Sequence, residues 1–290
     1  MRKKEESIGV YIHVPFCKKK CGYCDFLSFA SKESEITGYF KYLKKEIELY
    51  EKRVYDTIYF GGGTPSLASV EDIKSVLDSL EKDRNAEITI EVNPGTVTLE
   101  KLKRYREIGI NRISIGSQSF NNERLKVLGR IHDSNQTEEC FKNAREAGFD
   151  NISLDLMFAL PGQSKEELRE DIQKITEFEP EHISVYSLIW EEGTAFEKML
   201  SEGKSFQKSE EEEADMYEFV IKSLKESGYI HYEVSNFAKK GFEAKHNLKY
   251  WENREYLGIG LGASGYVSDV RYKNFTEFKE YYRAMDSREK

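Results

Sequence analysis

The sequence lacks the features that mark membrane-spanning and general nucleic-acid-binding proteins. No apolar run approaches the ~18 residues that a membrane-spanning helix needs, so we expect no transmembrane segment. Lys and Arg number 44 against 52 Asp and Glu, which gives a formal net charge of −8. A general nucleic-acid binder would carry an excess of basic residues instead. The composition therefore predicts no nucleic-acid partner.

Cysteine is also scarce, with four residues in a chain of 290, and no secretory signal is recognisable. Secreted proteins stabilised by disulfides use cysteine more densely. This usage predicts a reducing compartment, and we expect a cytoplasmic protein. Cys140 stands alone in a helix-like stretch, where the role of a small buried apolar residue is the simplest interpretation.

The other three cysteines lie in one short stretch, Cys17-Lys-Lys-Lys-Cys21-Gly-Tyr-Cys24, directly after the apolar run 8–14. Their spacing places three sulfurs where one metal centre can bind. A structural zinc site normally has four protein ligands, and a simple electron-transfer iron–sulfur cluster usually has four thiolates. Three sulfurs leave one metal position open, which indicates that a small molecule binds there. A structural zinc site completed by His13 or another residue is the alternative.

Short apolar runs alternate with amphipathic helical patterns along most of the chain. This alternation predicts a parallel sheet whose crossovers are right-handed helices. Six units are too few for a complete eight-stranded barrel, so we predict an α/β fold, a partial (β/α)6 barrel formed by residues 1–229. A doubly wound sheet is the competing topology. The predicted strands are 8–14, 56–60, 87–92, 112–116, 151–158 and 182–188, and the predicted helices are 36–52, 70–82, 98–108, 135–147 and 164–177.

Polar residues or glycines stand at the end of each predicted strand. Because the carboxyl ends of parallel strands converge on one mouth of a barrel, we expect the six loops that follow them to form one active site. Any one residue alone, such as Asp155, is better explained by a hydrogen bond to a neighbouring loop amide, but that explanation is much weaker for all of them together. The glycine run allows close approach of a ligand but lacks the Lys-Ser/Thr of a phosphate loop. The strand ends carry the cysteine loop, Gly61-Gly62-Gly63-Thr64-Pro65, Glu91, Gln118, Asp155, and Tyr186 with Ser187.

Residues 230–290 are aromatic, glycine-rich and locally basic, and we interpret them as a C-terminal extension. Just before them, the acidic run 209–213 is typical of the first turn of a helix, where the helix dipole favours negative charge. Within the extension, Gly260-Leu-Gly262-Ala-Ser-Gly265 formally matches a dinucleotide-binding fingerprint. The residues that follow are strand-like, whereas the fingerprint must open a helix, so we reject a dinucleotide site.

The motifs together resemble those of the radical S-adenosylmethionine (SAM) superfamily. The likeness rests on the Cys-x3-Cys-x2-Cys loop and the Gly-Gly-Gly-Thr-Pro run, and it covers essentially the whole chain. It is to the branch that contains oxygen-independent coproporphyrinogen III oxidases and the haem chaperones of HemW type. The further matching segments are 11–17, 115–120, 128–130, 154–162 and 232–237.

The resemblance implies a [4Fe-4S] cluster bound by Cys17, Cys21 and Cys24, with SAM chelating the open iron through its amino and carboxylate groups. A carboxylate can accept hydrogen bonds from a ribose or an ammonium group, and an arginine can bind a carboxylate with two hydrogen bonds. Residues matching the first cofactor site of the family are Tyr11, Gly62 and Glu91, and those matching a second site are Tyr23, Gly63, Thr64, Gln118, Arg130 and Asp155.

Two features separate the branches of the family. Oxidases usually carry a further cysteine where this chain has Phe26, and the chaperones carry His-Asn-x-x-Tyr-Trp, present here at 246–251. A neutral imidazole such as that of His246 is a natural axial ligand of haem iron, and aromatic neighbours suit a porphyrin face. A lone histidine is otherwise most simply a hydrogen-bonded structural residue.

We therefore predict a haem chaperone that binds haem, the cluster and SAM, and transfers haem to an acceptor such as a respiratory protein. The alternative is a coproporphyrinogen III oxidase, an enzyme that cleaves SAM to a 5′-deoxyadenosyl radical and decarboxylates a porphyrinogen. The resemblance leaves open whether this chain is an enzyme. Relatives continue into a small C-terminal domain, so we expect the extension 230–290 to be truncated.

Overall fold

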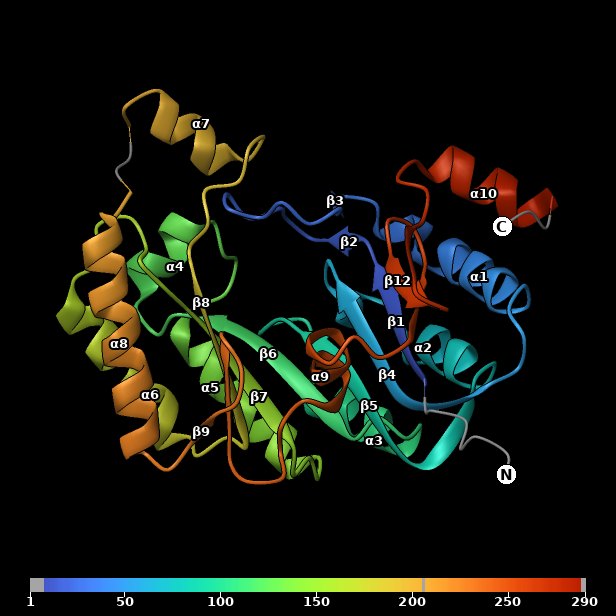
Figure 1. The fold of residues 1–290 in the computed structure, drawn as a ribbon, viewed down its shortest axis with the longest axis horizontal. Helices are drawn as coiled ribbons and strands as arrows, with labels where there is room; N and C mark the ends of the chain where they lie inside the picture. The colour runs from blue at the N-terminus through green and yellow to red at the C-terminus, as the bar shows by residue number, and fades with distance from the viewer. Residues whose placement is uncertain (1–7, 205–206, 288–290) are drawn as a thin grey trace.

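The computed structural model describes residues 8–204 and 207–287, which form one eleven-stranded sheet, a pair of two-residue strands and the helices around them (Figure 1). Six parallel strands lie side by side in chain order. A doubly wound sheet would reverse its strand order in the middle, so that alternative is wrong. The strands are β1 (Ile8–Val14), β4 (Val54–Gly62), β5 (Glu81–Val92), β6 (Arg112–Gln118), β7 (Ile152–Phe158) and β8 (His182–Ser187).

The helices that connect these strands follow the predicted alternation. They are α1 (Ile36–Ile47), α2 (Val70–Leu77), α3 (Leu99–Glu107), α4 (Asn122–Leu128), α5 (Ser134–Glu146) and α6 (Lys165–Glu177), and two 3-10 turns lie at Glu33–Glu35 and Pro65–Leu67. The prediction extended α1 to residue 52, but the chain leaves the helix after Ile47 through shorter i→i−3 hydrogen bonds at Leu49 and Tyr50. The short helix α4 was not predicted. None of the described helices has the length and apolar character needed to cross a bilayer.

The C-terminal part of the chain extends the sheet at both edges. After α7 (Ala195–Ser201) and α8 (Glu210–Glu226), β9 (Ile230–His231) and β10 (Asn236–Ala238) join antiparallel beside β8. At the opposite edge, β11 (Tyr256–Ile259) pairs parallel with β1, and the hairpin of β12 (Ser264–Val267) and β13 (Val270–Lys273) follows. The hairpin confirms that no helix follows Gly260–Gly265. The division of the chain at residue 230 stays a prediction.

Two further helices of this part pack on different sides of the sheet. Helix α10 (Phe278–Ser287) packs against α1, where Tyr282 stacks on Tyr42 with ring centroids 4.1 Å apart. Helix α9 (Lys245–Trp251) lies in the centre of Figure 1, on the opposite side of the strands from α1–α3. The Glu87 carboxylate of β5 accepts hydrogen bonds from the first two backbone N–H groups of α9. The extension thus closes one end of the partial barrel.

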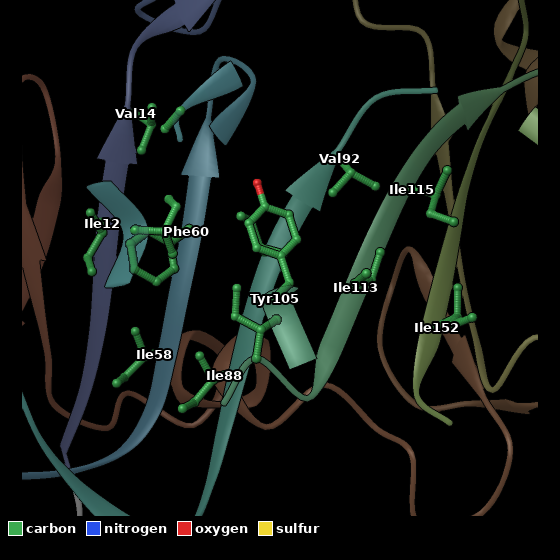
Figure 2. Packing of buried hydrophobic residues seen from close by; sticks show 14 of the residues in the cluster. Ile12, Val14, Ile58, Phe60, Ile88, Val92, Tyr105, Ile113, Ile115 and Ile152 are labelled. Atoms are coloured by element: carbon green, nitrogen blue, oxygen red, sulfur yellow. The ribbon is translucent and has the colours of Figure 1, made fainter. Parts of the chain in front are cut away.

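Alternation of side chains gives the sheet one apolar and one polar face. On β6, Ile113 and Ile115 are buried in the main hydrophobic core under the helices, whereas Arg112 and Ser114 face a cavity on the inner side. Figure 2 shows the apolar layer, including Ile12, Phe60 and Ile88 from neighbouring strands. Full burial of one such side chain stabilises the fold by ~1.5–3 kcal/mol. The apolar face therefore holds the sheet to its helices and leaves the inner face to polar residues.

Candidate functional site

The cysteine loop is anchored at both ends and packed between two helices. The short strands β2 (Phe16–Cys17) and β3 (Phe29–Ala30) pair with each other at its base. The Gly22 N–H donates to the Leu128 carbonyl of α4 over 3.2 Å, and the Gly22 carbonyl accepts from the Phe196 N–H of α7 over 3.0 Å. A Cβ at Gly22 would lie 2.6 Å from the Phe196 ring. Glycine is therefore required where the loop passes this helix.

Two of the cysteine sulfurs are linked by a chain of side-chain hydrogen bonds. Thr64 Oγ1 donates to Cys17 Sγ over 3.8 Å and accepts from Asn93 Nδ2 over 2.9 Å. Arg130 Nη2 donates to Asn93 Oδ1 over 2.5 Å, and Arg130 Nη1 donates to Cys21 Sγ over 3.7 Å. Hydrogen bonds donated to sulfur stabilise its negative charge when it binds a metal. The sequence showed Asn93 as part of a strand-end Asn-Pro, but its bridging role was missed.

A cavity of about 540 Å³ opens beside the cysteines, a volume suited to a small-molecule ligand. The predicted convergence of strand ends on one mouth is present. Eleven of the thirteen predicted site residues line the cavity: Cys17, Cys21, Cys24, Tyr23, Gly62, Gly63, Thr64, Glu91, Gln118, Arg130 and Asp155. Other lining residues sit within strands or on α9 and were not predicted: Tyr59, Arg112, Ser114, Ser184 and Asn247.

Glu91 and Asp155 are half-buried carboxyl groups that line this cavity. The Tyr59 hydroxyl donates to Glu91 Oε1 over 2.9 Å, and the Gly62 N–H donates to Oε2 over 3.1 Å. Burial raises the pKa of Glu91 to about 7, although the Tyr59 hydrogen bond works against this shift. Burial likewise raises the pKa of Asp155 to about 6, while the Ser114 hydroxyl donates to it over 3.1 Å. Both carboxyls can thus change charge near neutral pH.

The glycine run before Thr64 is required by packing within the chain. Gly62 has a φ of +112°, which favours glycine, and a Cβ there would lie 2.5 Å from the His13 ring. A Cβ at Gly63 would lie 2.7 Å from the Phe16 carbonyl oxygen. The sequence suggested that these glycines admit a ligand. In the structure they also let β4 pass close to the start of the cysteine loop.

Two predicted residues, Tyr11 and His246, lie outside this cavity. The Tyr11 hydroxyl is 2.9 Å from His13 Nδ1, and its ring lines a second cavity of about 370 Å³. His246 is only 1% exposed, with Nδ1 2.8 Å from Thr57 Oγ1 and Nε2 2.8 Å from the Tyr250 hydroxyl. Burial lowers the pKa of His246 to about 3, so its imidazole is neutral at physiological pH. Both ring nitrogens are therefore occupied, as in the structural role considered from the sequence.

The comparisons with known proteins agree with the geometry. The family model "Radical SAM superfamily" matches residues 11–175. The haem chaperone HemW of Lactococcus lactis is 41% identical over 280 residues, which cover 95% of this chain and 74% of that protein. The corresponding values for HemW of Bacillus subtilis are 40% over 282 residues, 94% and 74%. This chain belongs to the HemW family of radical SAM proteins.

A solved structure supports the same assignment of fold. Coproporphyrinogen III oxidase (HemN) from Escherichia coli, described as a radical SAM enzyme, matches with a TM-score of 0.85 at 26% sequence identity. The match covers 99% of this HemW-family chain and 70% of that chain. The predicted superfamily and the partial-barrel fold are both confirmed.

The donor chemistry of the cysteine site fits the [4Fe-4S] cluster that the radical SAM family implies for this HemW-family chain. All three cysteines line one cavity, and two of their sulfurs accept hydrogen bonds from Thr64 and Arg130. Across residues 8–204 and 207–287, no group of three or more His, Cys, Asp or Glu side chains is placed to hold one metal ion. A four-iron cluster is larger than an ion and needs its thiolates further apart.

The second cavity of the HemW-family chain adjoins the first cavity. It is lined by Tyr11, His13, Leu27, Tyr250, Tyr256, Gly262, Ser264 and Lys273, and it shares Asp25 and Phe26 with the first cavity. Tyr59 stands between the two sites, because its ring stacks on Tyr11 and on His246 while its hydroxyl reaches Glu91. The imidazole of His246 and the carboxyl of Glu91 thus contact the same tyrosine, Tyr59, from two sides.

Replacing Asn93 with leucine should loosen the cluster without disturbing the fold. Leucine fills a similar volume but has no polar atoms, so Thr64 and Arg130 each lose a partner beside a cysteine. Loss of such an outer hydrogen bond weakens metal binding by about tenfold or more. We expect the reconstituted N93L protein to release iron to a chelator about tenfold faster. Asn85→Leu, at an exposed position of β5, the strand that ends directly before Asn93, is the matched control, and equal release by both variants would contradict the prediction.

Glu91 should make folding stability fall with rising pH. Its native pKa of about 7 lies above the ordinary value of 4.5, so between these values the native state keeps a proton that the unfolded state has lost. The stabilisation is therefore fully present below pH ~4 and is lost as the pH rises through 7. Urea unfolding at several pH values should show a shallower decline between pH 5 and 7.5 for Glu91→Gln. Glu100→Gln, on the exposed side of α3, should leave the decline unchanged, and equal slopes for both variants would refute this role of Glu91.

Proposed function

We propose that this protein is a haem chaperone that binds haem together with a [4Fe-4S] cluster and SAM, and transfers the haem to an acceptor protein in the cytoplasm. Relatives named haem chaperone HemW, about 40% identical over most of the chain, support this function. The structural observation that supports it is the second cavity, which is lined by the rings of Tyr11, Tyr250 and Tyr256 and adjoins the neutral imidazole of His246.

Haem binds, in this proposal, at the second cavity and the end of α9. Tyr250 and Trp251 are 37% and 56% exposed and offer aromatic faces to a porphyrin. Lys273 at the same cavity supplies a positive charge for a propionate. The Tyr250 hydroxyl covers Nε2 of His246, so movement of this one side chain frees a neutral imidazole nitrogen for the haem iron.

The first cavity holds the cluster and SAM. Cys17, Cys21 and Cys24 are the cluster ligands, and when bound the cluster supplies an open iron and a source of one electron. Glu91 accepts hydrogen bonds from the ammonium or ribose of SAM. A nearby cation lowers the pKa of a buried carboxyl, so binding of the ammonium group favours the ionised form of Glu91.

Coproporphyrinogen III oxidase activity is the second candidate. The close structural match to HemN favours it. Against it stands Phe26, which occupies the position of the further cysteine that oxidases usually carry. Its side chain is 63% exposed at the lip shared by both cavities. A hydrophobic ring there suits contact with a porphyrin better than ligation of iron.

One anaerobic preparation separates the two functions. The protein is reconstituted with iron and sulfide, and haem binding is measured by titration of the Soret band while coproporphyrinogen turnover is followed by porphyrin fluorescence. We expect binding of one haem per chain and no turnover. Turnover without haem uptake would overturn the proposal. Protein without reconstitution serves as the control for the role of the cluster.

A further inference from the structure

Arg112 is a buried charge at the inner end of the first cavity. It is the first residue of β6, while Gln118 at the end of the same strand faces the cysteine mouth. Six residues of strand place the two Cα atoms roughly 20 Å apart. Arg112 is 2% exposed, yet it lines the cavity. The cavity therefore reaches from the cysteines to a guanidinium deep in the partial barrel.

Within residues 8–204 and 207–287, the Arg112 guanidinium makes no hydrogen bond and no ion pair, although its charge lowers the pKa values of the Glu91 and Asp155 carboxyls. Its Nε is buried without a hydrogen bond, and neither Glu91 nor Asp155 approaches it within the 4.0 Å of an ion pair. His182, which the charge of Arg112 also affects, has a hydrogen-bond partner on each ring nitrogen, Ser153 on one and Tyr232 on the other. A buried cation without a direct ion pair is unfavourable, which points to an anionic group of a ligand as its direct partner.

We propose that Arg112 binds a carboxylate of the ligand that fills this cavity. A guanidinium binds a carboxylate with two parallel hydrogen bonds. The inner end also offers hydrogen-bonding groups for the body of such a ligand, including Ser114, Ser184 and Asn247. Asn247 follows His246 on α9, so the same short helix contributes to both cavities. The carboxylate comes either from a second SAM molecule, which does not chelate the cluster iron, or from a propionate of haem that reaches from the second cavity past Tyr59 into the first.

This inference concerns a residue outside the predicted cofactor sites and rests on the proposed function only for its choice of ligands. The competing explanation is that Arg112 merely balances the charges of Glu91 and Asp155. The two explanations predict opposite effects of removing the Arg112 charge on the stability of the protein without ligands. Removal of an unpartnered buried charge relieves a cost, whereas removal of a needed counter-ion destabilises the fold.

The test uses Arg112→Met, which keeps length and apolar bulk, and Arg112→Lys, which keeps the charge but loses the two-pronged geometry. Arg254→Met is the matched control, because Arg254 is a surface residue paired with Glu252. Thermal unfolding is measured without ligands. We expect the Tm of R112M to equal or exceed that of the unsubstituted protein. A Tm lower by more than about 5 °C, with unchanged ligand affinities, would overturn the proposal.

Binding to the reconstituted proteins then identifies the source of the carboxylate. One arm compares SAM with its decarboxylated form, and the other compares haem with haem dimethyl ester. One of the two comparisons should show an effect. In that comparison, R112M should bind the ligand with a free carboxylate about 10–100-fold more weakly than the unsubstituted protein does, and should bind the ligand without it equally well. The affinity of R112K should lie between the two. Equal affinities in both arms would overturn the proposal whatever the Tm. If the unsubstituted protein binds neither SAM nor haem, the proposed function fails, and the Tm of R112M alone decides the role of Arg112.

Discussion

Replacement of Cys21 by serine is expected to abolish the iron–sulfur cluster. A serine oxygen is a poor substitute for a soft thiolate ligand, and three thiolates are the minimum that leaves only one iron open. The Arg130 guanidinium, which now donates to Cys21 Sγ, would also lose its sulfur partner. We expect iron and sulfide content near zero after reconstitution and loss of the broad absorbance of the cluster in the visible range.

The fourth cysteine provides the control for this experiment. Cys140 lies on α5, is 3% exposed and belongs to the hydrophobic core. Burial raises the pKa of its thiol to about 12, so it is an inert thiol at neutral pH. Cys140→Ala should therefore keep a full cluster and lose only some stability. A full cluster in Cys21→Ser, or an empty site in Cys140→Ala, would refute the assignment of the ligands.

Haem binding should depend on one nitrogen of His246. In His246→Gln the amide can still hydrogen-bond to Thr57 and Tyr250, so the fold should be retained. The imidazole that ligates iron is lost. We expect the Soret titration to lose its one-to-one endpoint and the spectrum of a histidine-ligated haem. His231→Ala, on β9 at the other edge of the sheet, should bind haem normally.

Tyr250→Phe should have the opposite effect on haem binding. Its hydroxyl occupies Nε2 of His246, and haem must displace it. Removal of one neutral hydrogen bond is worth about 1 kcal/mol, which corresponds to about fivefold tighter binding. A phenyl ring keeps the aromatic surface of the second cavity. Unchanged haem affinity in both Tyr250→Phe and His246→Gln would mean that haem binds elsewhere and that His246 is structural only.

Much of the fold could be predicted from local patterns. The alternation of strand-like and helix-like apolar patterns predicted six parallel strands, because each strand or helix must bury one apolar face. The residues at strand ends then had to share a mouth, and Glu91 and Asp155 do line one cavity with the cysteines. The strand β11 was missed because the short run Tyr256–Ile259 has no following helix and pairs with β1 across more than 240 residues of sequence.

Several site residues were missed for a related reason. Arg112 opens a strand instead of ending it, and the polar residues at every second position of β6 were the available signal that its inner face lines a cavity. Asn93 gains its role only from the approach of Thr64 and Arg130, which lie 29 and 37 residues away in the chain. No local pattern encodes such contacts.

The amino-acid sequence by itself determined the α/β class and the family and predicted the three cysteine ligands, because these depend on residue types at short spacings. Only the tertiary structure decided that His246 is held by Thr57 and Tyr250, that Tyr59 lies between His246 and Glu91, and that Arg112 has no direct ion pair. These features depend on which inward-facing side chains meet across the sheet. Strand register and the packing of α9 on the inner face of the sheet decide which of these side chains come into contact.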